Sequence, residues 1–174
     1  MSAGTPDATT QHDEKLDKVW RLISDAHSAL LVTATRDGTL DSRPMGCVQR
    51  GFEGTVWFLT FANSSKVKEI ADNSHVLVSY ARPAEYEYVS LSGRARVTKD
   101  DRKARELWSE AFRVWFPSGL DDPDLVVISV DVDEVKYWTD AASVVTYAWA
   151  YVKARVLGER PPAERVADVG SIKL

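Results

Sequence analysis

The stretch TVWFLTFANSSKVKEIADNSHVLVSYAR, residues 55–82, contains two strand-like segments on either side of a short helical one. Residues 55–61 and 75–82 are rich in β-branched and aromatic side chains, which is typical of strands. Between them, apolar residues recur at helical spacing over residues 65–72, and small polar side chains precede that run, where a helix would begin. Strands joined by so short a helix favour an antiparallel sheet over a doubly wound parallel one.

Further strand-like segments surround this stretch, at residues 28–35, 86–98, 125–132 and 134–138. The first ends at Arg36-Asp37-Gly38, which has the chemistry of a hairpin turn. The segment after that turn carries Pro44 and Gly46, and both residues are poor in a central strand. We therefore expect an edge, a bulge or an interrupted strand there. About six strands in all predict a mainly β protein, a six-stranded antiparallel barrel with flanking helices.

Helical spacing also predicts helices over residues 13–26, from residue 100 or 101 to 115, and over 143–158. A chain of 174 residues is long enough for one domain with a substantial core. We expect a disordered lead-in over residues 1–12, the barrel domain with its C-terminal helix over 13–158, and a tail over 159–174.

Composition excludes several classes of protein. A net charge of -4 and a pI of about 5.4 argue against a nucleic-acid partner held by a broad basic surface. A single cysteine, Cys47, excludes an internal disulfide framework and a multi-thiolate metal site. No segment is apolar enough to predict a membrane span or a signal peptide. We therefore expect a cytoplasmic protein with no membrane partner.

Familiar catalytic signatures are absent from the sequence. His12, His27 and His75 are scattered and do not have the spacing of metal ligands, so no metal site is predicted. The serine elbow, the phosphate-binding loop with its lysine and the glycine-rich dinucleotide fingerprint are all missing. Cys47, with no histidine nearby in sequence, is best interpreted as a small buried apolar residue. No catalytic residue can be assigned.

An anion-binding pattern lies where the strand at 55–61 turns into the helix at 65–72. Backbone N–H groups, the hydroxyls of Ser64 and Ser65, and the Lys66 ammonium would converge there, and a phosphate needs that combination of donors. Alternatively, one serine simply caps the helix and the lysines face solvent. This segment alone favours the capping interpretation.

Two further features suggest a ligand, and each has a simpler explanation. Arg43, in Ser42-Arg43-Pro44-Met45, could project its forked charge toward an anion, or could only protect an edge strand. Trp138, near the end of the last strand pair, could stack on a planar ring, or could pack in the core.

The order of these pieces is more specific than any one of them. Ser42-Arg43-Pro44-Met45 is followed by Ser64-Ser65-Lys66-Val67-Lys68, then by Ser92-Gly93-Arg94-Ala95 and Glu134-Val135-Lys136-Tyr137-Trp138. In this order the chain, over roughly residues 14–158, resembles the pyridoxamine 5'-phosphate oxidase-like superfamily with its FMN-binding split barrel. Within it, the resemblance is to the bacterial general stress protein branch.

This resemblance implies a homodimer with FMN, rather than FAD or a deazaflavin, in the cleft between the protomers. It implies that Ser65 and Lys66 hold the phosphate, with Arg43 as the second cation, and that Ser64 is also among the cofactor-binding residues. The backbone of Pro44 and Met45, together with Thr60, would lie along the flavin ring and ribityl chain. Trp138 would lie near the flavin, contributed by the partner chain.

The implied activity is that of a flavin-dependent oxidoreductase with a small-molecule electron donor or acceptor and an undefined substrate. A non-catalytic flavin buffer or sensor, and a deazaflavin-dependent reductase, remain as alternatives. Pyridoxamine phosphate oxidases end in a segment with arginine and histidine that binds the substrate. Residues 165–174, RVADVGSIKL, do not match that segment, so pyridoxamine phosphate oxidation is not expected.

Overall fold

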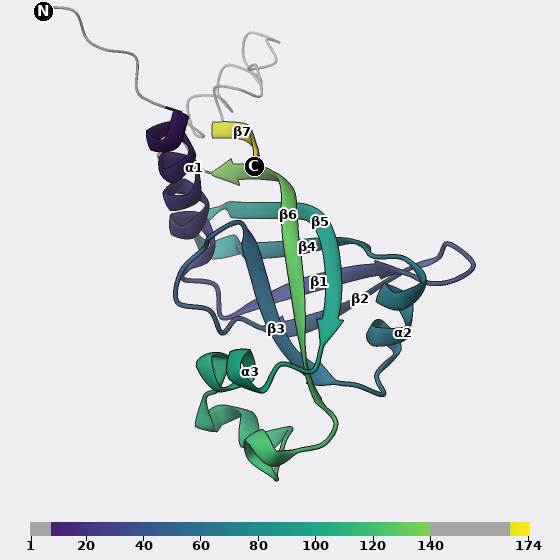
Figure 1. Cartoon of the computed structure of the whole chain (residues 1–174). Helices are drawn as coiled ribbons and strands as arrows, with labels where there is room; N and C mark the ends of the chain where they lie inside the picture. The colour runs from purple at the N-terminus through teal and green to yellow at the C-terminus, as the bar shows by residue number, and fades with distance from the viewer. Residues whose placement is uncertain (1–7, 140–167) are drawn as a thin grey trace, which may run out of the picture.

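The computed structural model describes residues 8–139 and 168–174 (Figure 1). Its helices are α1 Ala8–Ile23, α2 Ser65–Asp72 and α3 Asp101–Leu107. Its strands are β1 Ser28–Ala34, β2 Leu40–Gly46, β3 Thr55–Phe61, β4 His75–Arg82, β5 Glu87–Thr98, β6 Leu125–Thr139 and β7 Asp168–Lys173. Short 3₁₀ turns are η1 Pro83–Glu85, η2 Glu110–Val114 and η3 Gly119–Asp121. Among the described residues, no helix is both long and apolar enough to cross a membrane.

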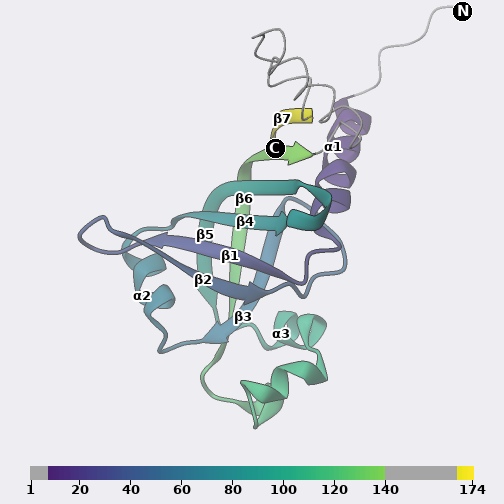
Figure 2. The same cartoon turned by 180° about the vertical axis from the view of Figure 1, so that it is seen from behind.

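The strands form one antiparallel sheet in the order β2-β1-β4-β5-β6-β3, and β7 pairs with the second half of β6. Figures 1 and 2 show that this sheet curls, so that β2 and β3, its two ends, approach each other. Within the described residues no ladder joins β2 to β3, and the barrel is split along that line. The prediction of a mainly β, six-stranded antiparallel split barrel with flanking helices is confirmed.

β1 and β2 form the predicted hairpin. Their register runs from Ser28 opposite Gly46 to Ala34 opposite Leu40, and the Thr35 N–H donates to the Thr39 carbonyl across the turn at 2.8 Å. β2 pairs only with β1 in the part of the chain that the structure describes, so it is an edge strand. An edge is where a strand tolerates Pro44, which has no N–H to donate.

The core fills the inside of the barrel. Alternate residues of the strands point inward, and α1 adds Val19 and Ile23. A second, smaller core lies between β3, β6 and α3; it contains Leu59, Ala104, Leu107, Phe116, Leu125 and Val127. β6 therefore begins with a run of apolar residues, Leu125–Ile128, because both faces of the strand are covered there.

A bulge in β6 lies where β5 and β6 approach each other closely. The register of the β5–β6 ladder shifts at this point, because Ser92 pairs with Glu134 whereas Gly93 pairs with Val132. A Cβ atom on Gly93 would lie 2.1 Å from the carbonyl oxygen of Asp131. Only glycine fits this position of β5 without moving the neighbouring backbone.

The two ends of the described chain meet at Tyr137. The Lys18 ammonium donates to the Tyr137 hydroxyl at 2.5 Å, and Tyr137 pairs with Gly170 of β7. A Cβ atom on Gly170 would lie 2.1 Å from that hydroxyl oxygen. Lys15 of α1 also donates to the Lys173 carbonyl at 3.3 Å. α1 and β7 are thus fastened to the same end of β6.

The structure differs from the sequence-based expectations at three places. α1 begins at Ala8, so part of the expected lead-in over residues 1–12 is helical. α3 ends at Leu107, and the chain turns at Trp108 before η2, whereas one helix to residue 115 was expected. The expected tail over 159–174 contains β7. The helix expected over residues 143–158 lies outside the described residues.

Candidate functional site

The N-terminus of α2 is the centre of the candidate site. Ser64 occupies the N-cap position in an extended conformation, but its side chain makes no capping hydrogen bond. Its hydroxyl instead donates to the Phe61 carbonyl at 2.8 Å. Ser65, the first residue of the helix, is exposed. Because no side-chain cap comes from Ser64, the positive end of the helix remains suited to an outside anion.

Lys66 does not point freely into solvent, as the capping interpretation required. Its ammonium donates to the Thr60 hydroxyl at 3.1 Å, and Thr60 is buried in β3. Burial lowers the pKa of Lys66 below its usual value, and the positive charge of Arg43 lowers it further, while Glu69 partly opposes both. The next lysine on the helix, Lys68, is exposed.

Arg43 reaches the same place from β2. Its Nη2 donates to Glu69 Oε2 and to Asp41 Oδ2, each at 2.8 Å. Its Nη1 donates to the Thr33 hydroxyl and, at 3.4 Å, to the Leu31 carbonyl. The Thr33 hydroxyl in turn donates to Glu69 Oε2. The guanidinium is thus held by residues of β1, β2 and α2.

We call Arg43, Lys66, Glu69, Thr33 and Thr60 the α2 cluster. The fold assembles it because α2 directly follows β3 and packs on β5 and β1, and β1 pairs with β2, the strand of Arg43 (Figure 2). Thr33 and Glu69 were missed by the sequence analysis. One signal was present: Glu69 lies three residues after Lys66 and therefore on the same side of α2.

Apart from the Glu69 carboxylate, which already accepts from Arg43, the α2 cluster consists of groups that suit a phosphate. Two cations from separate elements, a buried hydroxyl and the N-terminus of an eight-residue helix lie together. A lysine and a forked arginine are the side chains that bind phosphate oxygens. The predicted residues Arg43, Thr60, Ser64, Ser65 and Lys66 are therefore brought to one end of the barrel.

Pro44 and Met45 follow Arg43 along β2, but their side chains lie on opposite faces of the sheet. Pro44 is exposed and pairs with Leu30, whereas Met45 is buried in the core and pairs with Ala29. The prediction concerns the backbone of these two residues. In the part of the chain that the structure describes, no second strand pairs with β2 along the split, so its backbone is not covered there by another strand.

Trp138 lies far from the α2 cluster within one chain. Thr60 pairs with Val126 at the start of β6, whereas Trp138 pairs with Tyr88 and Val169 near the other end of the strand. At about 3.3 Å per residue, roughly 30 Å or more of strand separates the two positions. The Trp138 side chain is 39% exposed. One protomer therefore does not bring this tryptophan to the predicted site.

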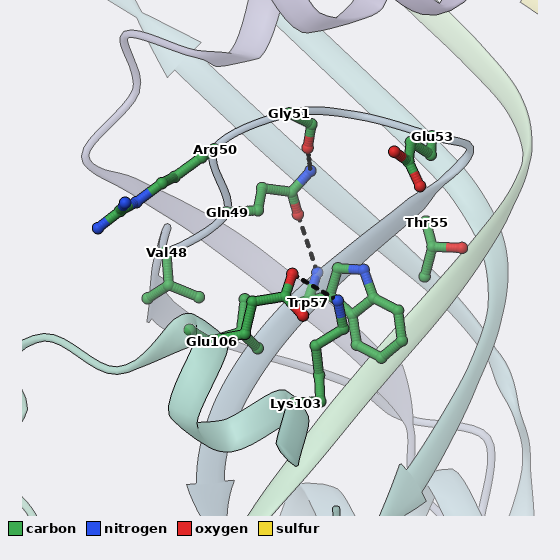
Figure 3. Close-up of a pocket in the computed structure, with 10 residues that line it drawn as sticks. Val48, Gln49, Arg50, Gly51, Glu53, Thr55, Trp57, Lys103 and Glu106 are labelled. Atoms are coloured by element: carbon green, nitrogen blue, oxygen red, sulfur yellow. Dashed lines mark hydrogen bonds and ion pairs between the residues drawn. The ribbon is translucent and has the colours of Figure 1, made fainter.

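A separate pocket of about 280 Å³ lies at the beginning of β3, between the loop after β2 and helix α3 (Figure 3). Gln49 crosses it, accepting from the Trp57 N–H at 3.0 Å and donating to the Gly51 carbonyl at 2.8 Å. Lys103 lies over the Trp57 ring, 4.4 Å from its centroid, and pairs with Glu106 at 2.8 Å. None of the predicted site residues lines this pocket, and the ring face is already occupied by an ammonium.

The described residues offer neither a reactive cysteine nor a group of metal ligands. Burial raises the pKa of the Cys47 thiol to about 11, against a smaller opposing effect of its hydrogen bond with Tyr80. The thiolate is the nucleophilic form, so at neutral pH only a small fraction of this cysteine is in that form. Among the described residues, no group of three or more histidine, cysteine, aspartate and glutamate side chains could hold a metal ion.

Comparisons with solved structures agree on the fold. A putative general stress protein 26 from Jannaschia sp. CCS1 is 20% identical, with a TM-score of 0.70 over 93% of this chain and 99% of that chain. A general stress FMN/FAD binding protein from Xanthomonas citri is 22% identical, with a TM-score of 0.65 over 76% of this chain and 93% of that one. General stress protein 26 from Bacillus anthracis str. Sterne is 22% identical, with a TM-score of 0.63 over 71% and 93% of the two chains.

No curated protein matches the sequence. A family model does match, over residues 14–162, and its description is pyridoxamine 5'-phosphate oxidase like. The match spans the strands of the split barrel from β1 to β6, and it includes α2 and all residues of the α2 cluster. By its sequence, and in agreement with its fold, the chain belongs to the pyridoxamine 5'-phosphate oxidase-like family.

Proposed function

We propose that this protein binds FMN through the α2 cluster and works as a flavin-dependent oxidoreductase. The observation that carries the proposal is that two cations lie near each other beside α2: Lys66, in the first turn of the helix, and Arg43, which pairs with Glu69. Lys66 and the helix N-terminus would hold the phosphate, and Arg43 would be the second cation. The FMN/FAD binding described for the Xanthomonas citri protein is consistent with this ligand.

A bound flavin would supply the electron-transfer chemistry, which needs no acid–base pair from the protein. The chain's own residues would then bind and orient the ligand. Thr60 positions the Lys66 ammonium, Thr33 positions the Arg43 guanidinium, and the edge of β2 along the split offers backbone groups beside Pro44. The unpaired thiol of Cys47 fits the reducing cytoplasm that we propose as the location.

The proposal includes a homodimer that completes the ligand site. The outer face of the sheet carries exposed apolar side chains on β1, β4, β5 and β6: Leu30 at 48%, Leu77 at 36%, Tyr88 at 43% and Trp138 at 39% exposure. We call these four residues the outer face. Pro44 is exposed beside Leu30, so the face continues to β2, the strand of Arg43. Ser79, Ser90 and Lys136 lie between these apolar side chains on the same face, and such a mixture of exposed apolar and polar groups is typical of an interface.

A second copy of the chain is the occupant that explains the outer face best. In a two-fold dimer the same surface of the two chains forms the interface, so a residue on one side of the two-fold axis contacts a residue from the other side of that surface. In the sheet, β2 and β6 lie on opposite sides of β4. A two-fold axis that runs along β4 would therefore set β2 of one chain against β6 of its partner. That arrangement would bring Trp138 toward the α2 cluster of the other chain, which one protomer does not do.

Leu77→Glu is expected to separate the dimer, because it places a charge within the outer face. The wild-type protein should sediment at about twice the chain mass of 19.4 kDa, and the variant at the mass of one chain. Val114→Glu is the matched control, since Val114 is 79% exposed on η2, away from the outer face. A wild-type monomer, or a Leu77→Glu dimer, would contradict the shared site.

The purified protein is expected to be yellow and to release FMN on denaturation. The absorption spectrum, followed by identification of the released flavin, checks this directly. Colourless protein that also fails to bind FMN on titration would remove the proposed function. The donors NADH, NADPH and a reduced deazaflavin are then tested in turn. Bleaching of the bound flavin supports an oxidoreductase, no bleaching by any donor indicates a non-catalytic flavin protein, and deazaflavin turnover without FMN indicates a deazaflavin-dependent reductase.

A further inference from the structure

The ion pair between Arg43 and Glu69 lies inside the proposed phosphate site. Their side chains are 14% and 12% exposed, and the two charged groups are 2.8 Å apart. Asp41, the other carboxylate on Arg43, is 53% exposed and therefore largely screened by solvent. Glu69 is thus the main counter-ion of a guanidinium that is mostly removed from water.

Glu69 also compensates the second cation of the cluster. The charge of Arg43 disfavours the ammonium form of Lys66, and the charge of Glu69 favours it. Two neighbouring, partly buried cations are costly unless an anion accompanies them. Without a ligand, that anion is Glu69.

Contacts of the guanidinium leave little room for an added anion. Nη1 donates to Thr33 and Leu31, and Nη2 donates to Asp41 and Glu69. Each of these nitrogens carries two hydrogens, so all four are already directed at acceptors. A phosphate that binds Arg43 through these nitrogens must replace one of the acceptors, and it would repel the Glu69 carboxylate.

We propose that Glu69 is a built-in counter-ion that holds Arg43 in the ligand-free protein and competes with the phosphate of the ligand for it. This inference rests on the proposed function, because it concerns the same site. It has two consequences of opposite sign. Glu69 stabilises the protein without ligand, and it lowers the affinity for ligands that carry a phosphate.

Glu69→Gln tests both consequences. The amide oxygen of glutamine can still accept from Arg43 and Thr33, so the packing is kept while the negative charge is lost. Without flavin, the variant should unfold at a lower temperature than the wild type. It should bind FMN about tenfold more tightly, a difference of about 1.4 kcal/mol. Affinity for riboflavin, which lacks the phosphate, should be unchanged.

Asp72→Asn is the matched control. It removes one carboxylate from the same helix, but Asp72 contacts the exposed Arg36 and not the α2 cluster. It should leave the FMN affinity unchanged. If Glu69→Gln binds FMN as tightly as the wild type or more weakly, Glu69 does not compete with the phosphate and the inference is overturned. A wild type that binds neither FMN nor riboflavin would instead count against the proposed function.

Inorganic phosphate gives a readout that does not depend on flavin. Thermal unfolding is followed in phosphate and in chloride at equal ionic strength. Phosphate should raise the unfolding temperature of Glu69→Gln more than that of the wild type, because it takes the place of the missing carboxylate. If the variant does not fold in chloride, refolding in phosphate should rescue it. Equal responses of the two proteins, or no rescue, would overturn the inference.

Discussion

Lys66→Glu is expected to weaken FMN binding by roughly 100-fold or more, a loss of about 2.7 kcal/mol. The substitution removes the partly buried cation at the N-terminus of α2 and puts a second carboxylate near Glu69. A phosphate would then meet repulsion where the present side chain attracts it. Titration of the flavin-free protein with FMN, followed by flavin fluorescence, measures the change.

Lys68→Glu is the control for this experiment. It makes the same change in net charge on the same helix, but Lys68 is exposed and two residues away. An exposed charge is screened by water and salt, so the FMN affinity should change by only a few-fold. Equal losses in the two variants would show a general charge effect and would remove Lys66 from the site.

Gly93→Ala is expected to cost about 3 kcal/mol of stability, although it adds only one methyl group. The new Cβ would lie 2.1 Å from the Asp131 carbonyl oxygen and 3.0 Å from the Val132 Cα. Neither atom can retreat easily, because Asp131 pairs with Arg94 of β5 and with Thr55 of β3. For a chain of this size the midpoint of thermal unfolding should fall by roughly 10 °C.

Gly51→Ala is the matched substitution for this comparison. A Cβ atom at Gly51 would have no neighbour within 4 Å, and the residue is not among those with a positive φ. Its unfolding midpoint should therefore stay close to that of the wild type. If Gly93→Ala unfolds like Gly51→Ala, the strands at the bulge can separate and the close approach does not limit the choice of residue.

The parts of the fold that sequence predicts well are those set by neighbouring residues. The hairpin at Arg36-Asp37-Gly38, the edge strand with Pro44, and the short helix α2 after Ser64 each follow from local chemistry. The break after α3 does not. Trp108 has an extended conformation, and further along Phe116 packs on Phe61 of β3 in the second core, which is a contact with a distant segment that helical spacing does not predict.

β7 was missed for a related reason. Its six residues contain Gly170, which weakens the strand pattern. That glycine is explained by Tyr137 on the neighbouring strand, and a contact with a distant part of the chain leaves no signal in the local sequence.

In the candidate site, too, some residues could be predicted from the local sequence and others could not. Lys66 and the serines before it lie in one segment, so local chemistry was enough to predict an anion site there. Arg43 was joined to them only through the family resemblance, and the structure brings it to α2 through its ion pair with Glu69. That pair links a strand and a helix that are 26 residues apart in the sequence, and each residue looks like an ordinary surface charge there. Trp138 remains a prediction that depends on the partner chain.

The meeting of α1 and β7 at Tyr137 has a consequence for shortened forms of this protein. A chain that stopped before Asp168 would uncover the backbone of β6 from residue 134 to residue 139. It would also remove the Lys173 carbonyl that accepts from Lys15. An uncovered strand edge recruits strands from other molecules, so such a chain would be prone to aggregation. Residues 168–174 thus cover an edge of the sheet that would otherwise be free to pair with strands of other molecules.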